Sequence, residues 1–366
     1  MTFLALALLA VGTPADSTLS VAYRRDDRAA PLYAACLYPG DFRQRYNLYL
    51  RPVTPQQQYD LYDGRRRTLS IRFKPFDTDS AVLTSLLAGT SQVGILAPEP
   101  AMQAVLGAGP VKVIAPLQYK GDLLVMPAAA PVLDWPGFIN WLKQQTGPVA
   151  VGYIGQEPMN VLGFEQALEY ENITRTRRAD SAARVRLVRL GSPDQVHTDL
   201  ASGSVAAVVV ESNLAAELES TGAARIVCEL HDLAPNRFEN RPATVIAALD
   251  SSARTRDRDI ERFLELMGVA THYANNRTRN TFAAAARWLN QPAAVESVSL
   301  SYVGFSSSPG RAFRDGLWNW YFALRLKNAV PESLSGFMER DEWLHIPYDS
   351  SLVSPALDRA GARIVK

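Results

Sequence analysis

The spacing of apolar positions in residues 191–227 predicts a helix, a strand, a second helix and the start of another strand. Ser192, Pro193 and Gln195 carry the start signals of the first helix: an N-cap, a proline at the first helical position and the glutamine of a capping box. Gly203 can adopt the left-handed conformation that ends this helix. The next residues, 205–210, are continuously apolar, as in a strand covered on both faces of a parallel sheet.

A looser copy of this pattern occupies residues 76–115. Asp77 or Thr78 can cap its first helix, residues 93–96 form the strand, and a second helix starts at 98–100. Two such units so far apart in the chain predict two similar lobes.

The residues that follow the two strands are candidates for ligand binding, because open α/β sheets bind ligands beyond the carboxyl ends of their strands. Pro98 and Glu99 follow the earlier strand, and Glu211 and Ser212 follow the later one. Ser212 can alternatively act only as a helix cap.

The composition is that of a globular protein with two domains. Its 366 residues are 47% hydrophobic and 20% charged, which is enough for two substantial cores. Lys plus Arg is 38 and Asp plus Glu is 37, so the charge balance does not favour nucleic acid or an anionic membrane as a partner. After the N-terminal run, no apolar segment is long enough for a membrane span.

Residues 1–16 resemble a secretory signal peptide. An apolar run is followed by small residues, with Thr13 and Ala15 at the positions of a cleavage signal, although basic residues do not precede the run. A buried N-terminal strand or helix is the alternative. We therefore expect an exported protein that acts in the periplasm or outside the cytoplasmic membrane.

The cysteines and histidines indicate neither a metal site nor a cofactor. The four histidines are scattered without the spacing of metal ligands. Cys36 and Cys228 either form a disulfide that would fix the hinge between the lobes or, as we favour, remain unpaired.

LVRLGSPDQVHTDLASGSVAAVVV, residues 187–210, contains a hydrophobic strand, a small residue and a proline before a helix, and the helix ending Leu-Ala-Ser-Gly. This segment is the most specific resemblance to a known family, the substrate-binding proteins of ABC importers in the nitrate, sulfonate, taurine and thiamine-precursor group. VAYRRDDRAAPLYAAC, IRFKPFDTDSAVLTSLLAG and QVGILAPEPAMQAV are similar to the family's first strand and helix, second strand and helix, and next strand and loop. Residues 49–69 depart from the pattern, being longer than the family's link, and predict a surface loop or a hairpin.

The resemblance implies the type II periplasmic binding fold. We expect lobe one at residues 17–119 and 252–366 and lobe two at residues 120–251. Each lobe would be a mainly parallel sheet flanked by helices, with the ligand in a cleft between the lobes and closure by a hinge motion.

Two groups of residues in lobe one could bind an anion. Arg24 and Arg25 follow the first strand, where a guanidinium can bind an acidic group through paired hydrogen bonds, or they belong to a solvated cluster with the charged residues 26–28. Thr78 and Ser80 open a helix whose amides can bind an anion, and capping alone would explain them equally well.

In lobe two, the resemblance places the ligand loop at Gly155, Gln156 and Glu157. Glycine lets the backbone approach a ligand closely, and glutamine offers both a donor and an acceptor. Tyr153, like Tyr23 and Tyr33, could stack on a planar ligand or belong to the core.

These features predict a monomeric solute-binding protein that delivers a small molecule to an ABC permease and its ATPase. The arginines and helix starts favour an oxyanion such as a sulfonate or nitrate, and the tyrosines favour a planar heterocycle such as a pyrimidine. The alternative is an enzyme of the same fold acting on a chorismate-derived menaquinone precursor, with Asp26, Glu99, Glu157 and Glu211 as available acid–base groups. The apolar leader counts against that alternative.

Overall fold

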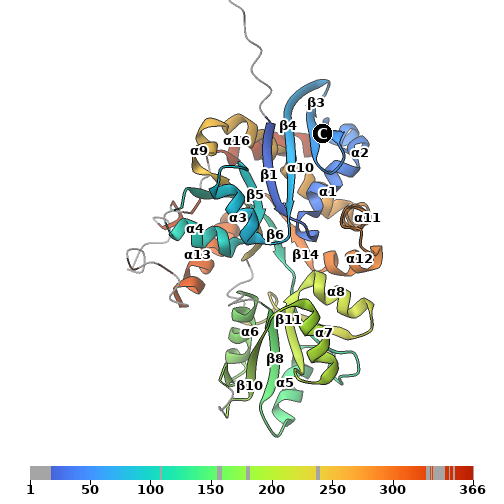
Figure 1. Cartoon of the computed structure of the whole chain (residues 1–366), viewed down its shortest axis with the longest axis vertical. Coiled ribbons are helices and arrows are strands. Elements are labelled where there is room, and N and C mark those ends of the chain that lie inside the picture. The colour runs from blue at the N-terminus through green and yellow to red at the C-terminus, as the bar shows by residue number, and fades with distance from the viewer. Residues whose placement is uncertain are drawn as a thin grey trace, which may run out of the picture.

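The computed structural model describes residues 18–107, 109–154, 159–178, 182–235, 240–326, 330, 332, 343–345, 347–348 and 351–365. These residues form two α/β lobes, each built around one sheet, stacked one above the other in Figure 1. The leader-like residues 1–16 and the expected ligand loop, Gly155, Gln156 and Glu157, lie outside the described residues.

The first lobe contains an eight-stranded mixed sheet in the order β14-β6-β13-β5-β1-β4-β3-β2. Its strands are β1 (Thr18–Arg24), β2 (Leu48–Thr54), β3 (Gln58–Asp63), β4 (Arg66–Phe76), β5 (Val93–Leu96), β6 (Val111–Lys120), β13 (Pro242–Leu249) and β14 (Val303–Phe305). Only β1 with β4 and β1 with β5 pair in parallel among these strands. The expectation of a mainly parallel sheet is therefore wrong for this lobe, because a hairpin extends one edge and β13 inserts in the opposite direction.

The second lobe contains a six-stranded sheet in the order β12-β7-β11-β8-β10-β9. Its strands are β7 (Asp122–Pro127), β8 (Val149–Ile154), β9 (Arg175–Thr176), β10 (Val185–Leu190), β11 (Ala207–Glu211) and β12 (Ala224–Glu229). The strands β11, β8, β10 and β9 are parallel, and β7 is antiparallel to both of its neighbours. Here the parallel expectation holds for the centre of the sheet.

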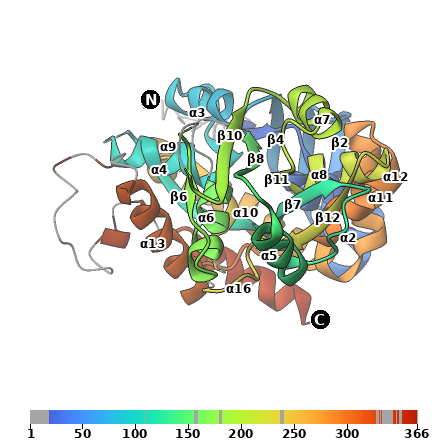
Figure 2. The same cartoon turned by 90° about the horizontal axis from the view of Figure 1, so that it is seen from below.

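Helices cover both faces of each sheet. On the first lobe, one face carries α1 (Ala30–Leu37), α2 (Pro39–Tyr46), α10 (Asp257–Asn276), α11 (Thr278–Leu289), α12 (Ala293–Ser301) and α16 (Val353–Ile364), and the other carries α3 (Asp79–Leu87), α4 (Pro98–Leu106) and α13 (Arg311–Leu326). On the second lobe, α5 (Trp135–Gln144) and α6 (Met159–Tyr170) lie opposite α7 (Pro193–Ser202) and α8 (Ser212–Ser220), as Figure 2 shows from below. A short 3-10 helix, η1 (Asp27–Ala29), follows β1, and α9 (Asp250–Thr255) follows β13.

The repeated unit predicted from the sequence is present in both lobes. The elements α3, β5, α4 and β6 form the earlier copy, and α7, β11, α8 and β12 form the later one. The cap of α7 is also confirmed, since the Ser192 hydroxyl accepts the Gln195 backbone N–H at 3.2 Å and Gly203 has φ 74°. In each copy the two strands are separated by one antiparallel strand, β13 in the first lobe and β7 in the second.

The chain crosses between the lobes at two places. The first crossing is at Lys120 and Gly121, whose φ angles of 66° and 92° turn the chain from β6 into β7. The return lies before Pro242, because β13 pairs with β5 and β6 in the first lobe. The expected end of lobe two at residue 251 is therefore too late in the chain. The apolar strand β13 would suit either sheet, and only its pairing with β5 and β6 assigns it to the first lobe.

Residues 49–69, expected as a loop or a hairpin, contain the hairpin of β2 and β3. Leu48, Leu50 and Leu61 on these strands are completely buried, so the segment extends the sheet and its core. Cys36 and Cys228, one in each lobe, are both free.

Candidate functional site

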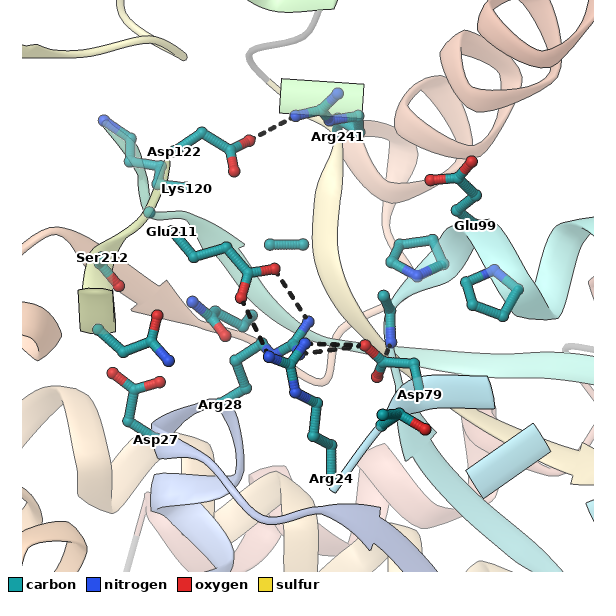
Figure 3. A pocket seen from close by; sticks show the side chains of 18 of the residues that line it. Arg24, Asp27, Arg28, Asp79, Glu99, Lys120, Asp122, Glu211, Ser212 and Arg241 are labelled. Carbon is teal, nitrogen blue, oxygen red and sulfur yellow. Dashed lines mark hydrogen bonds and ion pairs between the residues drawn. The ribbon is translucent and has the colours of Figure 1, made fainter. Parts of the chain in front are cut away.

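A cavity of about 430 Å³ lies where the carboxyl ends of β1, β4 and β5 face that of β11 across the two lobes. Both lobes contribute to its wall (Figure 3). The lining residues are Arg24, Asp27, Arg28, Asp77, Thr78, Asp79, Ser80, Ala97, Pro98, Glu99, Pro100, Gln118, Lys120, Gly121, Asp122, Glu211, Ser212, Asn213, Arg241, Ala243 and Trp320. This is the volume of a pocket for a small molecule.

A cluster of ion pairs forms the floor of the cavity on the side of the first lobe. Arg24 ends β1, and the parallel pairing with β4 places it beside Phe76, close to the start of α3. Its Nη1 lies 3.1 Å from Oδ2 of Asp79, and Nη2 of Arg28 lies 3.2 Å from the same oxygen. Asp26 binds both guanidinium groups, at 3.0 Å from Arg24 Nε and 2.8 Å from Arg28 Nη2. Two arginines thus share two carboxylates within one lobe.

Asp79 also connects the cluster to the neighbouring strand end. Its Oδ1 accepts the backbone N–H of Ala97 at 2.9 Å, immediately before α4. Burial raises the pKa of the Asp79 carboxyl, but Arg28 and Arg24 outweigh it, and the pKa is lowered. Asp79 is therefore a permanent anion that holds the starts of α3 and α4 together.

Glu211 brings the second lobe into this cluster. It ends β11, and its two oxygens lie 3.6 Å from Arg24 Nη2 and 3.7 Å from Arg28 Nη1. These distances exceed those of a close charge-assisted hydrogen bond, about 2.7–2.9 Å. The Glu211 side chain keeps 44% of its surface exposed, so the contact between the lobes is loose and faces the cavity.

Asp27 lies deeper in the same wall. Its side chain is almost fully buried, and its Oδ2 accepts a hydrogen bond from the Ser299 hydroxyl. Burial and the adjacent Asp26 carboxylate raise the pKa of Asp27 to about 6. This carboxyl therefore titrates close to neutral pH.

A second buried ion pair lies where the two crossing segments meet. Nη2 of Arg241 lies 2.6 Å from Oδ2 of Asp122 at the start of β7. The Arg241 guanidinium also stacks over the Trp320 ring, 5.2 Å from its centroid, and the Trp320 indole donates to the Pro242 carbonyl at 3.2 Å. Burial raises the pKa of Asp122, and Arg241 opposes the shift.

Three helices begin at the cavity. Thr78 caps α3 by accepting the Ala81 N–H at 3.2 Å, Pro98 is the first residue of α4, and Ser212 is the first residue of α8. The Ser212 and Ser299 hydroxyl oxygens lie 3.1 Å apart. Because the single Ser299 hydroxyl hydrogen is donated to Asp27, Ser212 is the donor in this hydrogen bond, which ties α8 to α12 of the other lobe. Capping explains Thr78, whereas Ser80 is exposed on the cavity wall.

The structure brings together most of the residues predicted from the sequence. The predicted residues that line the cavity are Arg24, Thr78, Ser80, Pro98, Glu99, Glu211 and Ser212. Arg25 is exposed and does not line it, because successive side chains around the strand end point in different directions. Tyr153 is also outside the lining: its ring is buried in the core between β8 and the helices α5 and α6, and Tyr23 and Tyr33 are buried in the core of the first lobe.

Some lining residues were missed by the sequence analysis. The interpretation of residues 26–28 as a solvated charge cluster is wrong, since Asp26, Asp27 and Arg28 are all at least nine-tenths buried. Asp79 had a usable signal, because it is the first helical residue after a strand that ends at the cleft. Asp122 and Arg241 had none, since they are far apart in the chain and meet only at the crossing.

Comparisons with known proteins add to this geometry. No protein-family model matches the chain. An uncharacterized protein from Methanocaldococcus jannaschii is 29% identical over 80 residues, which are 22% of this chain. The match spans 55% of that protein, so it covers little more than half of the relative.

Solved structures match over nearly the whole chain. The ligand-binding component of an ABC-type import system from Staphylococcus aureus, solved with zinc bound, has a TM-score of 0.66 at 11% identity, with 93% of this chain and 99% of that chain covered. The periplasmic nitrate-binding protein from Synechocystis PCC 6803 has a TM-score of 0.64 at 11% identity, covering 95% and 90%. The periplasmic aliphatic sulphonate binding protein from Escherichia coli has a TM-score of 0.61 at 14% identity, covering 87% and 90%.

This chain has the periplasmic binding protein fold. Its cavity lies between the two lobes, and the chain crosses from one lobe to the other on each side of residues 122–229. Both features agree with what the sequence resemblance implied. In the part of the chain that the structure describes, no helix combines the length and apolar character needed to cross a membrane. The same part holds no group of three or more His, Cys, Asp or Glu side chains arranged to bind a metal ion.

Proposed function

We propose that this protein is the solute-binding component of an ABC importer, which captures a small molecule between its lobes and delivers it to a permease and its ATPase. The observation that carries the proposal is the cavity itself, which has the size of a small-molecule pocket and is lined by strand ends and helix starts from both lobes. Proteins of this fold that bind nitrate or aliphatic sulphonate, and one that belongs to an ABC-type import system, support it by analogy.

The loose contact across the cleft supports binding by lobe closure. Glu211 approaches Arg24 and Arg28 without reaching close hydrogen-bond distance, so a ligand that neutralises or bridges these groups would draw the lobes together. The crossing at Lys120 and Gly121 supplies a place for the hinge, since closure of this kind uses a few residues between rigid lobes.

The same contacts favour binding over catalysis. Asp26 and Glu211, two of the carboxylates available for acid–base chemistry, lie against arginine guanidinium groups. These carboxylates are engaged in the ion pairs that connect the strand ends, which gives them a structural role in binding and closure. The protein would act outside the cytoplasmic membrane, as a monomer, without a covalent step.

A ligand screen on the purified full chain tests this function. Solutes are ranked by thermal shift, since a ligand at 100 times its Kd adds about 2.7 kcal/mol to the free energy of unfolding. Small-angle scattering then measures whether the best solute makes the protein more compact, and chromatography follows whether the solute is chemically changed. Compaction with an unchanged solute is expected, and turnover of a chorismate-derived compound would overturn the proposal.

A further inference from the structure

The charges around the cavity are unbalanced toward the negative. Its described lining has four basic side chains, Arg24, Arg28, Lys120 and Arg241, and six acidic ones, Asp27, Asp77, Asp79, Glu99, Asp122 and Glu211. The net charge of this wall is −2 when all ten are ionised.

The basic groups are already engaged by carboxylates. Arg24 and Arg28 share Asp26 and Asp79, as described above. Arg241 binds Asp122 at 2.6 Å, and Lys120 binds Asp232 at 2.6 Å. An anionic solute would have to compete with these carboxylates for every guanidinium it met, and it would lie in a field that repels it.

Two acidic groups, in contrast, face the cavity with capacity left for a cation. Glu211 is 44% exposed and lies 3.6 and 3.7 Å from its guanidinium neighbours, which leaves room for a closer donor. Asp77 is exposed at the rim, just before α3, and forms no ion pair with the described residues. They come from opposite lobes, so a cation placed between them would attract both walls.

We infer that the solute carries a cationic nitrogen, as an ammonium, amidinium or guanidinium group, and that Glu211 is its principal partner. This inference rests on the proposed solute-binding function and makes its ligand class more specific. An organic cation fits better than a metal ion. One or two carboxylate contacts satisfy an organic cation, whereas a metal ion takes more oxygen ligands. Asp79 and Asp122 are not available as such ligands, because guanidinium groups already bind them. The arginines, read from the sequence as anion receptors, serve instead to hold the carboxylates in place.

Matched probes separate charge from shape. Isothermal titration and thermal shift compare benzamidine with benzamide and benzoate, and putrescine with succinate. The panel also includes the cation agmatine and the anions nitrate and ethanesulfonate. We expect at least one of the three cationic probes to bind, and each cation that binds to do so at least about tenfold more tightly than every anion of the panel, since a hydrogen bond to a charged group is worth about 1.5–3 kcal/mol. Tighter binding of benzoate, succinate, nitrate or ethanesulfonate would overturn the cationic class and leave the solute-binding role intact.

Charge-neutralising variants locate the cation. Glu211→Gln is expected to weaken binding of the best cation at least about tenfold, and Asp77→Asn to weaken it by a smaller factor, because Asp77 is more exposed. Asp194→Asn removes the same charge from an exposed position on α7 outside the cavity and is the matched control. Asp77→Asn keeps the test valid if Glu211→Gln disturbs the fold, and equal binding by all three variants would overturn the inference.

If none of the three cationic probes binds, a second experiment decides. In that case, solutes extracted from the producing cells are added, compaction is followed by scattering, and the bound compound is identified by mass spectrometry. An anionic or neutral compound would overturn the cationic class alone. A complete absence of binding and compaction would overturn the solute-binding function as well.

Discussion

Nη1 of Arg28 in the first lobe lies 3.7 Å from Oε1 of Glu211 in the second lobe. Arg28 is buried and fixed by Asp26 and Asp79, whereas Glu211 is 44% exposed at the end of β11. One partner of this contact is therefore rigid and the other is free to withdraw. The two lobes can therefore separate at this contact without breaking the buried ion pairs of Arg28.

Glu211→Gln should weaken the contact between the two lobes without unfolding the protein. The variant removes the charge that attracts both guanidinium groups, but an exposed ion pair at this distance is worth only about 0–1 kcal/mol. We expect a larger radius of gyration in the ligand-free protein, measured by small-angle scattering, with an almost unchanged melting temperature. Scattering curves identical to those of the parent protein would contradict this role for Glu211.

Arg241→Met should destabilise the protein strongly. It leaves the buried Asp122 carboxylate without its closest cation, and breaking a buried ion pair costs about 3–5 kcal/mol. Urea denaturation measures the loss in the free energy of unfolding. Arg254→Met is the control, because Arg254 forms an exposed pair with Asp250 one helical turn away, and its loss should cost at most about 0.5 kcal/mol.

A double variant tests the cause of that loss. Arg241→Met combined with Asp122→Leu removes the unpaired buried charge and should recover much of the stability, as replacing a whole buried pair by apolar residues is often neutral. If the double variant were less stable than Arg241→Met alone, the unpaired carboxylate would not be the reason.

Gly316→Ala should destabilise the protein through a steric clash. Gly316 lies in α13 against the returning chain, and a Cβ there would overlap the Asn240 carbonyl oxygen and approach Pro242 Cδ to 2.8 Å. Overpacking of this kind costs about 1–3 kcal/mol. Gly361→Ala, in α16 with open space around the new methyl group, should instead stabilise by about 0.5–1 kcal/mol, because alanine favours the helix. Melting temperatures that move in the same direction would refute the packing explanation.

Glu296 should make stability fall as the pH rises. Its Oε2 atom is buried and has no hydrogen-bond partner among the described residues, and burial, Asp27 and Asp26 raise its pKa from 4.5 to about 8. The folded state then holds a proton that the unfolded chain releases, so the stabilising effect of that proton is complete below pH 4.5 and is lost as the pH rises through about 8. Glu296→Gln should flatten this decline.

Urea denaturation between pH 4.5 and 8.5 measures the slope for both proteins. Part of the decline should remain in Glu296→Gln, because the pKa of Asp27, about 6, is raised for the same reason. The exposed Glu217→Gln on α8 is the control and should keep the parent slope. A Glu296→Gln slope equal to that of the parent would show that Glu296 does not hold the proton.

Local patterns in the sequence determined the repeated unit and its position. Ser192, Gly203 and the apolar run before Glu211 act within a few residues of one another, so capping and periodicity were sufficient to predict α7 and β11. The same rule placed Glu99 and Glu211 at strand ends that line the cavity. The resemblance to the importer proteins then gave the two-lobed fold, which the solved structures share.

The tertiary structure decided which sheet each strand joins and which charged side chains form ion pairs. The sequence of β13 suits either lobe, and only pairing with β5 and β6 assigns it to the first. Residues 26–28 look like a solvated run, yet the structure buries them. A buried charge is destabilising unless opposite charges compensate it, and two of the carboxylates near Arg28 come from α3 and β11. The electrostatic character of the cavity follows from those long-range meetings, because Coulomb interactions depend on distance in space and not on separation along the chain.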